Sequence, residues 1–221
     1  MKQLLLATHN QHKLDELRRI LATVADQLPE VEVVGLDDIG PFDAPKETGA
    51  TFVDNAVLKA RAAASQCHLI TIADDSGITI DALNGMPGVL SARWAGQHGD
   101  DEANLRLVLN QLADVPDDRL GAAFICAAAL IVPGTNRGKV AEERMVGHLV
   151  REPRGENGFG YDPIFVALGE TLTNGELPPE RKDAISHRGK ALRTLVPYIV
   201  TAMGGSSPLV SVSPSATKIG S

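Results

Sequence analysis

The sequence is poor in the features that mark secreted, zinc-binding and membrane proteins. Its two cysteines, Cys67 and Cys126, lie in mostly apolar neighbourhoods without a metal-ligand spacing, which predicts buried free thiols in a reducing compartment. No His/Cys cluster indicates zinc. No apolar run is long enough to span a membrane, and the run near the N-terminus is too short for a signal peptide. We therefore expect a cytoplasmic protein.

Positively charged residues are fewer than negatively charged ones. The sequence has 21 Lys and Arg residues and 28 Asp and Glu residues, which gives a net charge of −7. This balance argues against nonspecific binding to nucleic acid or to an anionic membrane, since both need a positive field. An anionic small substrate would need local Lys or Arg, or a cation that neutralises it. The length of 221 residues suits one domain or a domain with two lobes.

Strand-like and helix-like patterns alternate along most of the chain. Strand patterns fall at 3–7, 31–36, 69–83 (as two segments that meet at Asp-Asp-Ser-Gly), 122–132 and 140–150, with a further strand after a Gly-rich loop at 151–166. Helical patterns fall at 8–24, from a cap at Thr51 to about Ser65, at 99–115, and twice between 177 and 203. The order predicts an α/β fold with a mixed sheet. Residues 204–221 are rich in Ser, Gly and Pro and are interpreted as a flexible tail.

The stretch THNQHK joins the first strand pattern to the first helix pattern. Asn10 is a plausible N-cap, so free backbone N–H groups and the positive end of the helix dipole would point outward there. Lys13 falls in or near the first turn, and a phosphate could meet amides and an ammonium together. The stretch is not a Walker A loop. The alternative is an ordinary capped helix with a solvated lysine.

Acidic residues form a second candidate group. Asp74 and Asp75 follow an apolar strand pattern and should point to opposite sides, so at most one faces a given cleft. Asp-Ser-Gly is also good turn material, which leaves a plain turn open. Glu47 could serve a metal or only complement a helix N-terminus. Asn55 and Lys59 share a helix face, which could line the same cleft or simply be solvated.

The stretch NGFGYDP could bind a planar base. Its two glycines would allow close backbone approach, Phe159 or Tyr161 could stack on the base, and Asp162 could accept bonds from it. The alternative is a Gly-rich loop with both rings in the core.

Farther on, RKDAISHRG offers cationic groups. Arg188 could donate to a base carbonyl or clamp a phosphate, and Lys182 could supply a point charge. For His187 we rank binding above a general-base role.

The order of these motifs is more specific than any one of them. T-x-N-x-x-K, ETGATFVDNA, ADDSG, PGVLSARW, GFGYDPIF and SHRG occur in sequence, and over about residues 1–203 the chain closely resembles the inosine/xanthosine triphosphate pyrophosphatase family. The resemblance implies an elongated α/β domain with a mixed central sheet and helices in two lobes around a substrate cleft, usually as a homodimer. It also implies Mg²⁺-dependent hydrolysis of ITP, dITP and XTP to the monophosphate and pyrophosphate, which cleanses the nucleotide pool.

The resemblance also implies roles for individual residues. Asp75 matches the catalytic acid and metal-binding position, Glu47 matches a second metal-associated acid, and Asp74 is left as a structural neighbour. The positions that match substrate contacts are Thr8, His9, Asn10, Gln11, His12, Lys13, Ser76, Phe159, Gly160, Tyr161, Asp162, Lys182, His187 and Arg188. A donor such as Arg188, or a backbone N–H near SHRG, would pair with the 6-oxo group of hypoxanthine or xanthine and disfavour adenine.

Two departures and two alternatives accompany the resemblance. His9 stands where a smaller residue is expected, and Arg144 and Met145 stand where a Trp-containing strand is expected. The alternatives are a Mg²⁺-dependent phosphatase that acts on another nucleotide or a sugar phosphate, and a nucleotide-binding module without catalysis.

Overall fold

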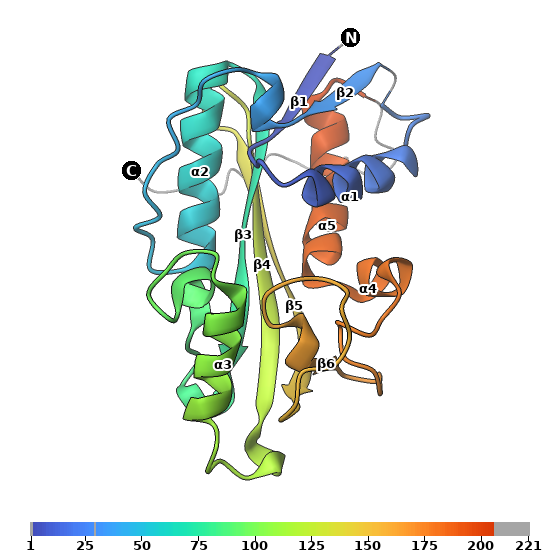
Figure 1. Ribbon diagram of the computed structural model, residues 1–221. Coiled ribbons are helices and arrows are strands. Elements are labelled where there is room, and N and C mark those ends of the chain that lie inside the picture. Colours follow the sequence, from blue (N-terminus) through green and yellow to red (C-terminus); the bar gives the residue numbers. More distant parts are fainter. Residues whose placement is uncertain (1, 29, 206–221) are drawn as a thin grey trace. The chain divides into compact units, whose positions relative to one another are not determined.

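The computed structural model describes residues 2–28 and 30–205 (Figure 1). Of the expected tail, residues 206–221 lie outside the described part. The principal elements are β1 (Lys2–Leu6), α1 (Gln11–Ala22), β2 (Val31–Val34), α2 (Phe52–Cys67), β3 (Ile70–Ile80), α3 (Asp101–Gln111), β4 (Gly121–Ile131), β5 (Gly138–Leu149), β6 (Phe165–Ala167), α4 (Pro179–Ile185) and α5 (His187–Ala202). Within the described ranges, no helix has the length and apolar character needed to cross a membrane.

The strands form one six-stranded sheet in the order β2-β1-β3-β4-β5-β6. β1 runs parallel to β2 and to β3, whereas β5 and β6 are antiparallel. The predicted α/β class with a mixed sheet is therefore confirmed. β1 pairs with β3 from Leu4 opposite Ile70 to Leu6 opposite Ile72. Asp74 and Asp75 therefore lie on β3 just beyond the level at which the neighbouring β1 ends. Ligands bind beyond the carboxyl ends of the strands in parallel sheets.

β3 corrects one expectation from the sequence. Residues 69–83 were expected to form two strand segments that meet at Asp74 to Gly77, but one strand runs without interruption from Ile70 to Ile80. Ile72 before the acidic pair and Ile78 after it are both fully buried. Burial on both sides of the acidic pair holds the chain extended, so tertiary packing overrides the local turn preference.

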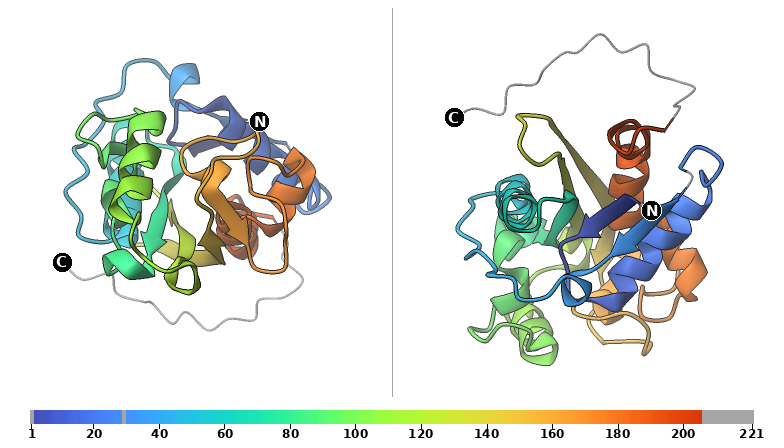
Figure 2. Two further views of the ribbon diagram at one scale, coloured as in Figure 1. Left: turned by 60° about the horizontal axis from the view of Figure 1, so that its bottom comes forward. Right: turned by 90° about the horizontal axis from the view of Figure 1, so that it is seen from above.

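Two compact units can be distinguished by their internal contacts. Unit 1 consists of Met1–Asp75, Ala127–Glu142 and Ala191–Ser221, and unit 2 of Ser76–Cys126 and Glu143–Lys190. In unit 1, α2 lies on one face of the sheet and α1 and α5 on the other, as Figures 1 and 2 show. Fully buried Leu4 and Leu5 of β1 and Ala60 of α2 belong to its core.

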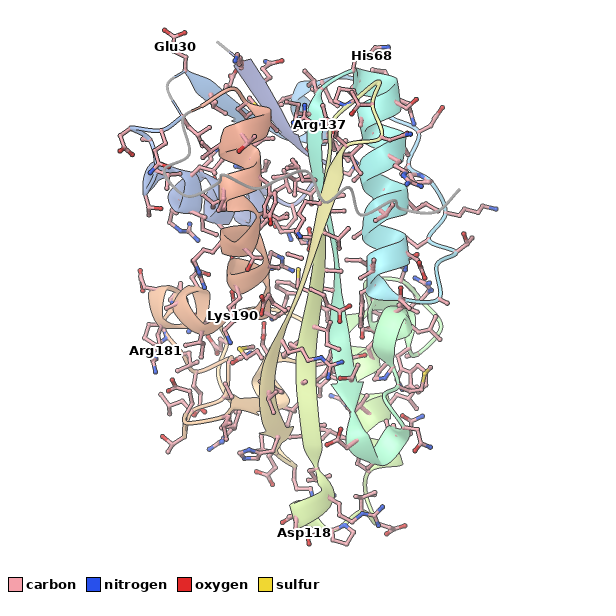
Figure 3. The ribbon with its side chains drawn as sticks, turned by 180° about the vertical axis from the view of Figure 1, so that it is seen from behind. Glu30, His68, Asp118, Arg137, Arg181 and Lys190 are labelled. Atoms are coloured by element: carbon pink, nitrogen blue, oxygen red, sulfur yellow. The ribbon has the colours of Figure 1, made fainter. Side chains whose placement is uncertain are left out.

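α2 begins and ends as its sequence dictates. Thr51 Oγ1 accepts from the Asp54 N–H at 3.1 Å, and Asp54 Oδ2 accepts from the Thr51 N–H at 3.1 Å, which forms a capping box. His68, at the end of α2 in Figure 3, has the left-handed conformation with φ 55°. The predicted cap at Thr51 is confirmed, and the helix runs two residues beyond the expected end.

Unit 2 packs its core around aromatic rings. Phe124 of β4 and Phe165 of β6 meet edge to face, with ring centroids 4.8 Å apart. Met145, one of the two departures on β5, is buried in this core. Lys190 of α5 lies beside β5 in Figure 3 and donates to the Arg144 carbonyl at 3.3 Å.

Both cysteines are free thiols, as predicted. Cys126 is buried, whereas Cys67, at the last position of α2, is only half-buried.

Candidate active site

The loop between β1 and α1 is held by its own polar side chains. Thr8 Oγ1 accepts from the Asn10 N–H at 3.1 Å, and Asn10 Oδ1 accepts from the His12 N–H at 2.9 Å. The predicted N-cap at Asn10 is therefore confirmed. The first turn of α1 carries no acidic residue of its own.

Lys13 is not the solvated lysine of the alternative interpretation. Its Nζ lies 3.0 and 2.8 Å from the two carboxylate oxygens of Asp74. The Asp74 side chain is only 4% exposed and that of Lys13 20%. A buried carboxylate therefore fixes the ammonium group at the start of α1.

The other three residues expected in this loop lie at the surface. His9 Nδ1 is 2.7 Å from Asp37 Oδ1, and both side chains are exposed. Gln11 donates to Asp15 at 3.0 Å, and His12 is exposed.

Asp75 belongs to a second polar cluster in unit 1. Its Oδ1 accepts from Lys59 Nζ at 2.8 Å, and its Oδ2 accepts from Asn55 Nδ2 at 3.1 Å. The same Lys59 Nζ lies 2.8 Å from Glu47 Oε1. Asn55 is fully buried, so this face of α2 is not the solvated face of the alternative interpretation. Adjacent Asp74 and Asp75 thus contact different lysines, as the alternation of side chains along a strand requires.

Close backbone approach holds the segment before α2 against the cluster. Asn55 Oδ1 accepts from the Gly49 N–H at 2.8 Å. A Cβ at Gly49 would lie 2.6 Å from that same oxygen. Only glycine fits there without displacing Asn55, which in turn contacts Asp75.

Burial and charge act in opposite directions on this cluster. Burial, with a smaller effect of the Glu47 charge, raises the pKa of the Asp75 carboxyl group despite the opposing effects of Lys59 and Asn55. Burial also lowers the pKa of Lys59, but the charges of Asp75 and Asp74, together with hydrogen bonds to Asp75 and Glu47, outweigh it and leave the pKa of Lys59 raised. Lys59 therefore keeps its positive charge, and the carboxylate of Asp75 is a stronger base than that of an ordinary aspartate.

The same cluster suits a hard divalent cation. Glu47 Oε1 and Asp75 Oδ1 both lie 2.8 Å from one ammonium nitrogen, so they are at most twice that distance apart. Across the described residues, no group of three or more His, Cys, Asp and Glu side chains is arranged for a metal. Mg²⁺ commonly takes one or two carboxylates and completes its shell with water and phosphate oxygens, so two acids fit it.

Unit 2 builds a different arrangement around Asp162. This buried carboxylate accepts from the Phe159 N–H at 2.8 Å and from Lys182 Nζ at 2.5 Å, both through Oδ2. Its Oδ1 accepts from Asn174 Nδ2 at 3.1 Å. Phe159 is 53% exposed, and the Lys182 ammonium lies 5.5 Å from the centroid of its ring. An exposed aromatic face beside a fixed cation can bind a planar ring.

Tyr161 does not share the exposure of Phe159. It is buried, its hydroxyl group donates to the Ser91 carbonyl at 2.8 Å, and burial with a smaller effect of Asp101 raises its pKa. Its ring therefore lies in the core, which leaves Phe159 as the exposed ring of this loop, and a substrate contact of Tyr161 stays a prediction. Gly160, with φ 62°, donates its N–H to Asp101 at 2.9 Å.

The remaining predicted residues lie at the start of α5 and on β3. His187 is buried and stacks on Phe124, with ring centroids 5.1 Å apart and planes 13° apart. Arg188 follows in the first turn and is half-buried, as is Ser76 on β3. Ser186 Oγ accepts from the Gly189 N–H at 2.9 Å, which caps the helix start.

Sequence reasoning missed Asn174. It stands in Thr-Asn-Gly, which reads as an ordinary turn, and its contact with Asp162 joins residues 12 apart in a loop without periodicity. The link between Lys13 and Asp74 was missed as well, because it spans 61 residues.

Comparison with known proteins identifies the family. A dITP/XTP pyrophosphatase of Nocardia farcinica is 55% identical over 199 residues, 90% of this chain and 95% of that protein. One of Streptomyces coelicolor is 53% identical over 205 residues, 92% of this chain and 100% of that protein. The structure of a HAM1 protein from Coxiella burnetii matches with a TM-score of 0.82 at 40% identity, covering 91% of this chain and 100% of that one.

A crystal structure from Mycobacterium abscessus, described as a nucleoside-triphosphatase / dITP/XTP pyrophosphatase, matches with a TM-score of 0.74. It is 51% identical and covers 89% of this chain and 99% of that one. The sequence model of the Ham1 family matches residues 4–198. These matches confirm the resemblance found in the sequence, and the chain belongs to the Ham1 family.

Proposed function

We propose that this chain hydrolyses non-standard purine nucleoside triphosphates (ITP, dITP and XTP) to the monophosphate and pyrophosphate. The names of relatives at 53–55% identity support this activity. The structural observation that carries it is the buried Asp75, held between Lys59 and Asn55 and sharing Lys59 with Glu47. Such a group combines a proton acceptor, a metal-binding acid and a fixed cation.

Hydrolases of this family generally depend on a metal ion, and we assign Mg²⁺ to Glu47 and Asp75. Bound there, Mg²⁺ would neutralise the charge by which a triphosphate repels a nucleophile. Carboxylate oxygens are its preferred protein ligands, which supports the assignment.

Asp75 would also orient the attacking water and accept its proton. Its raised pKa suits this role, because a stronger base removes a proton from water more readily. Asn55 donates to Oδ2 and holds the carboxylate plane in one orientation. Lys13 and the amides at the start of α1 would bind phosphate oxygens, and an ammonium near the leaving pyrophosphate would stabilise its developing charge.

The group in unit 2 would bind the purine. Phe159 offers the stacking face and Lys182 a cation beside it. Arg188 or a neighbouring N–H would donate to the 6-oxo group of hypoxanthine or xanthine. Adenine carries an amino group at that position and would leave the donor unpaired, so ATP should be a poor substrate.

We also propose that the protein acts as a cytoplasmic homodimer. The support is an exposed apolar pair, Val146 within β5 and Leu168 just after β6: Val146 is 54% and Leu168 83% exposed, and the Leu168 N–H donates to the Val146 carbonyl at 2.8 Å. Contiguous exposed apolar side chains can mark a subunit interface. Sedimentation should show a dimer, and Leu168→Glu should shift it toward the monomer.

The decisive experiment compares ITP, XTP, dITP, GTP and ATP with Mg²⁺, with pyrophosphate and orthophosphate detected separately. We expect pyrophosphate from the first three and little product from ATP and GTP. Orthophosphate as the first product would show a phosphatase instead, and binding without turnover would show a binding module. Equal rates with ATP and ITP would refute the proposed selectivity.

A further inference from the structure

Asn174 contacts the buried carboxylate of Asp162, which also binds Lys182 and the Phe159 N–H of the proposed purine site. The residue is fully buried in unit 2, and its Nδ2 donates to Asp162 Oδ1 at 3.1 Å. A carboxylate can only accept there, so the NH₂ side of the amide must face Asp162. The orientation of Asn174 therefore follows from the chemistry of its partner.

The other end of the same amide has no such partner. Asn174 Oδ1 is buried, and no donor among the described residues forms a hydrogen bond with it. A buried polar atom in this state lowers stability, so an apolar residue would serve packing better. The amide is therefore better explained by what its Nδ2 does to Asp162.

Other bonds fix the backbone around Asp162. The Gly175 N–H donates to the Asp162 carbonyl at 3.1 Å, and the Asn157 N–H donates to the Gly175 carbonyl at 2.9 Å. Thr173 Oγ1 donates to the Arg154 carbonyl at 2.8 Å. The loop thus has anchors that do not use the Asn174 side chain, whose bond goes to the carboxylate itself.

We propose that Asn174 is a positioning residue for the purine, which rests on the function proposed above. By holding Oδ1 of Asp162, it turns Oδ2 toward Lys182 and the Phe159 N–H, and so sets both groups that meet the base. Without this bond the carboxylate can rotate, and its Oδ2 no longer holds Lys182 and the Phe159 N–H in fixed positions. Asn174 itself does not touch the substrate.

Asn104 provides a matched control. It is also a buried asparagine of unit 2, its Oδ1 accepts from the Ala95 N–H at 2.7 Å, and its Nδ2 has no partner among the described residues. Asn174→Ala and Asn104→Ala therefore remove the same side chain from similar surroundings. Only the first change removes a bond to Asp162.

The test measures KM and kcat with ITP, and dissociation constants for inosine monophosphate and for pyrophosphate with Mg²⁺. Asn174→Ala should raise KM and the monophosphate constant about tenfold, as expected for a lost hydrogen bond to a charged group, with kcat and the pyrophosphate constant within about twofold. Asn104→Ala should change none of them. Equal effects in both variants, or an unchanged monophosphate constant in Asn174→Ala, would overturn the proposal.

Two further measurements tie the effect to its route. In a Lys182→Met background, Asn174→Ala should raise the monophosphate constant by a smaller factor than in the wild-type background, because one of the two groups that Asp162 positions is already lost. Amide hydrogen exchange at Phe159 should be faster in Asn174→Ala than in Asn104→Ala, and this needs no substrate. It therefore tests the positioning role even if the wild-type chain releases no pyrophosphate from ITP. Unchanged exchange would refute the role.

A second variant guards against misfolding. Asn174→Ser leaves a smaller void and a hydroxyl group too short to reach Asp162, so the same rise in the monophosphate constant is expected. A wild-type constant in Asn174→Ser would contradict the proposal.

Discussion

Unit 1 and unit 2 each pair a buried aspartate with a lysine, but they surround the pair differently. In unit 1, Asp75 shares Lys59 with a second carboxylate, Glu47. In unit 2, Asp162 shares Lys182 with the exposed ring of Phe159. The same ion pair is thus placed once among further charges and once beside an aromatic face.

Charge explains what this difference does. The unit 1 group brings the carboxylates of Glu47, Asp74 and Asp75 together with the ammonium groups of Lys13 and Lys59. Closely spaced carboxylates attract a divalent cation, and with it a triphosphate. The pair Asp162 and Lys182 is balanced, which suits an uncharged planar ring. Changes in the two groups should therefore affect different kinetic parameters.

The largest effect is expected from Asp75→Asn. It removes the proposed base and a metal ligand while keeping the shape, so kcat should fall by about 10²–10⁴-fold. Binding of inosine monophosphate should stay within a few-fold, because Phe159 and Lys182 are unchanged. Stopped assays of pyrophosphate release and calorimetry measure the two quantities. Asp43→Asn, at an exposed acid of unit 1, should leave both unchanged. Turnover of Asp75→Asn near the wild-type rate would contradict the role of Asp75.

Lys13→Met should weaken both activity and stability. It leaves the buried Asp74 carboxylate without this cation, which costs about 3 kcal/mol of unfolding free energy. We also expect kcat/KM to fall about 100-fold through the lost charged contact to phosphate. Urea denaturation and ITP kinetics give the two values. In the double variant with Asp74→Asn, much of the stability should return while activity stays low. A return of both would mean that Lys13 acts only on folding.

Phe159→Ala should affect unit 2 alone. Loss of a stacking face worth about 1–3 kcal/mol should raise the dissociation constant of inosine monophosphate about tenfold or more. The dissociation constant of Mg²⁺ should not change, since Glu47 and Asp75 belong to unit 1. Calorimetry measures both. Phe159→Tyr keeps the ring and should behave as the wild type; a similar loss in that variant would exclude stacking as the cause.

The smallest effect concerns stability and pH in the absence of metal. Burial raises the pKa of Asp75, so the folded state binds this proton more tightly than the unfolded state. The ionised carboxylate therefore lowers stability as pH rises through the raised pKa. Asp75→Asn should be more stable than the wild type at about pH 8, and this difference should shrink at about pH 5. Thermal unfolding in a chelator measures it. A difference that grows toward acid would reverse the sign and contradict the burial argument.

Local signals allowed part of the structure to be predicted. Asn10 and Thr51 cap their helices through bonds that span two or three residues, and such patterns are visible in the sequence. The acidic pair was found as well, but its setting was not. Asp-Asp-Ser-Gly favours a turn by itself, and only packing along β3 keeps it extended.

Long-range pairs set the remainder of the site. Lys13 meets Asp74 across 61 residues, and Asn174 meets Asp162 from a loop without periodicity. Neither contact has a spacing from which it could be predicted. The opposite burial of Phe159 and Tyr161, two residues apart in one loop, is likewise decided by the core that receives Tyr161.

Gly158 sets a limit on engineering this protein. Its φ of 78° suits glycine, and a Cβ there would lie 2.2 Å from Asp162 Oδ2 and 2.7 Å from Lys182 Nζ. Even alanine would displace Asp162 and Lys182, which lie beside the exposed ring of Phe159. A designer who wants a different nucleobase preference must therefore leave this position untouched and vary the residues whose side chains already face outward.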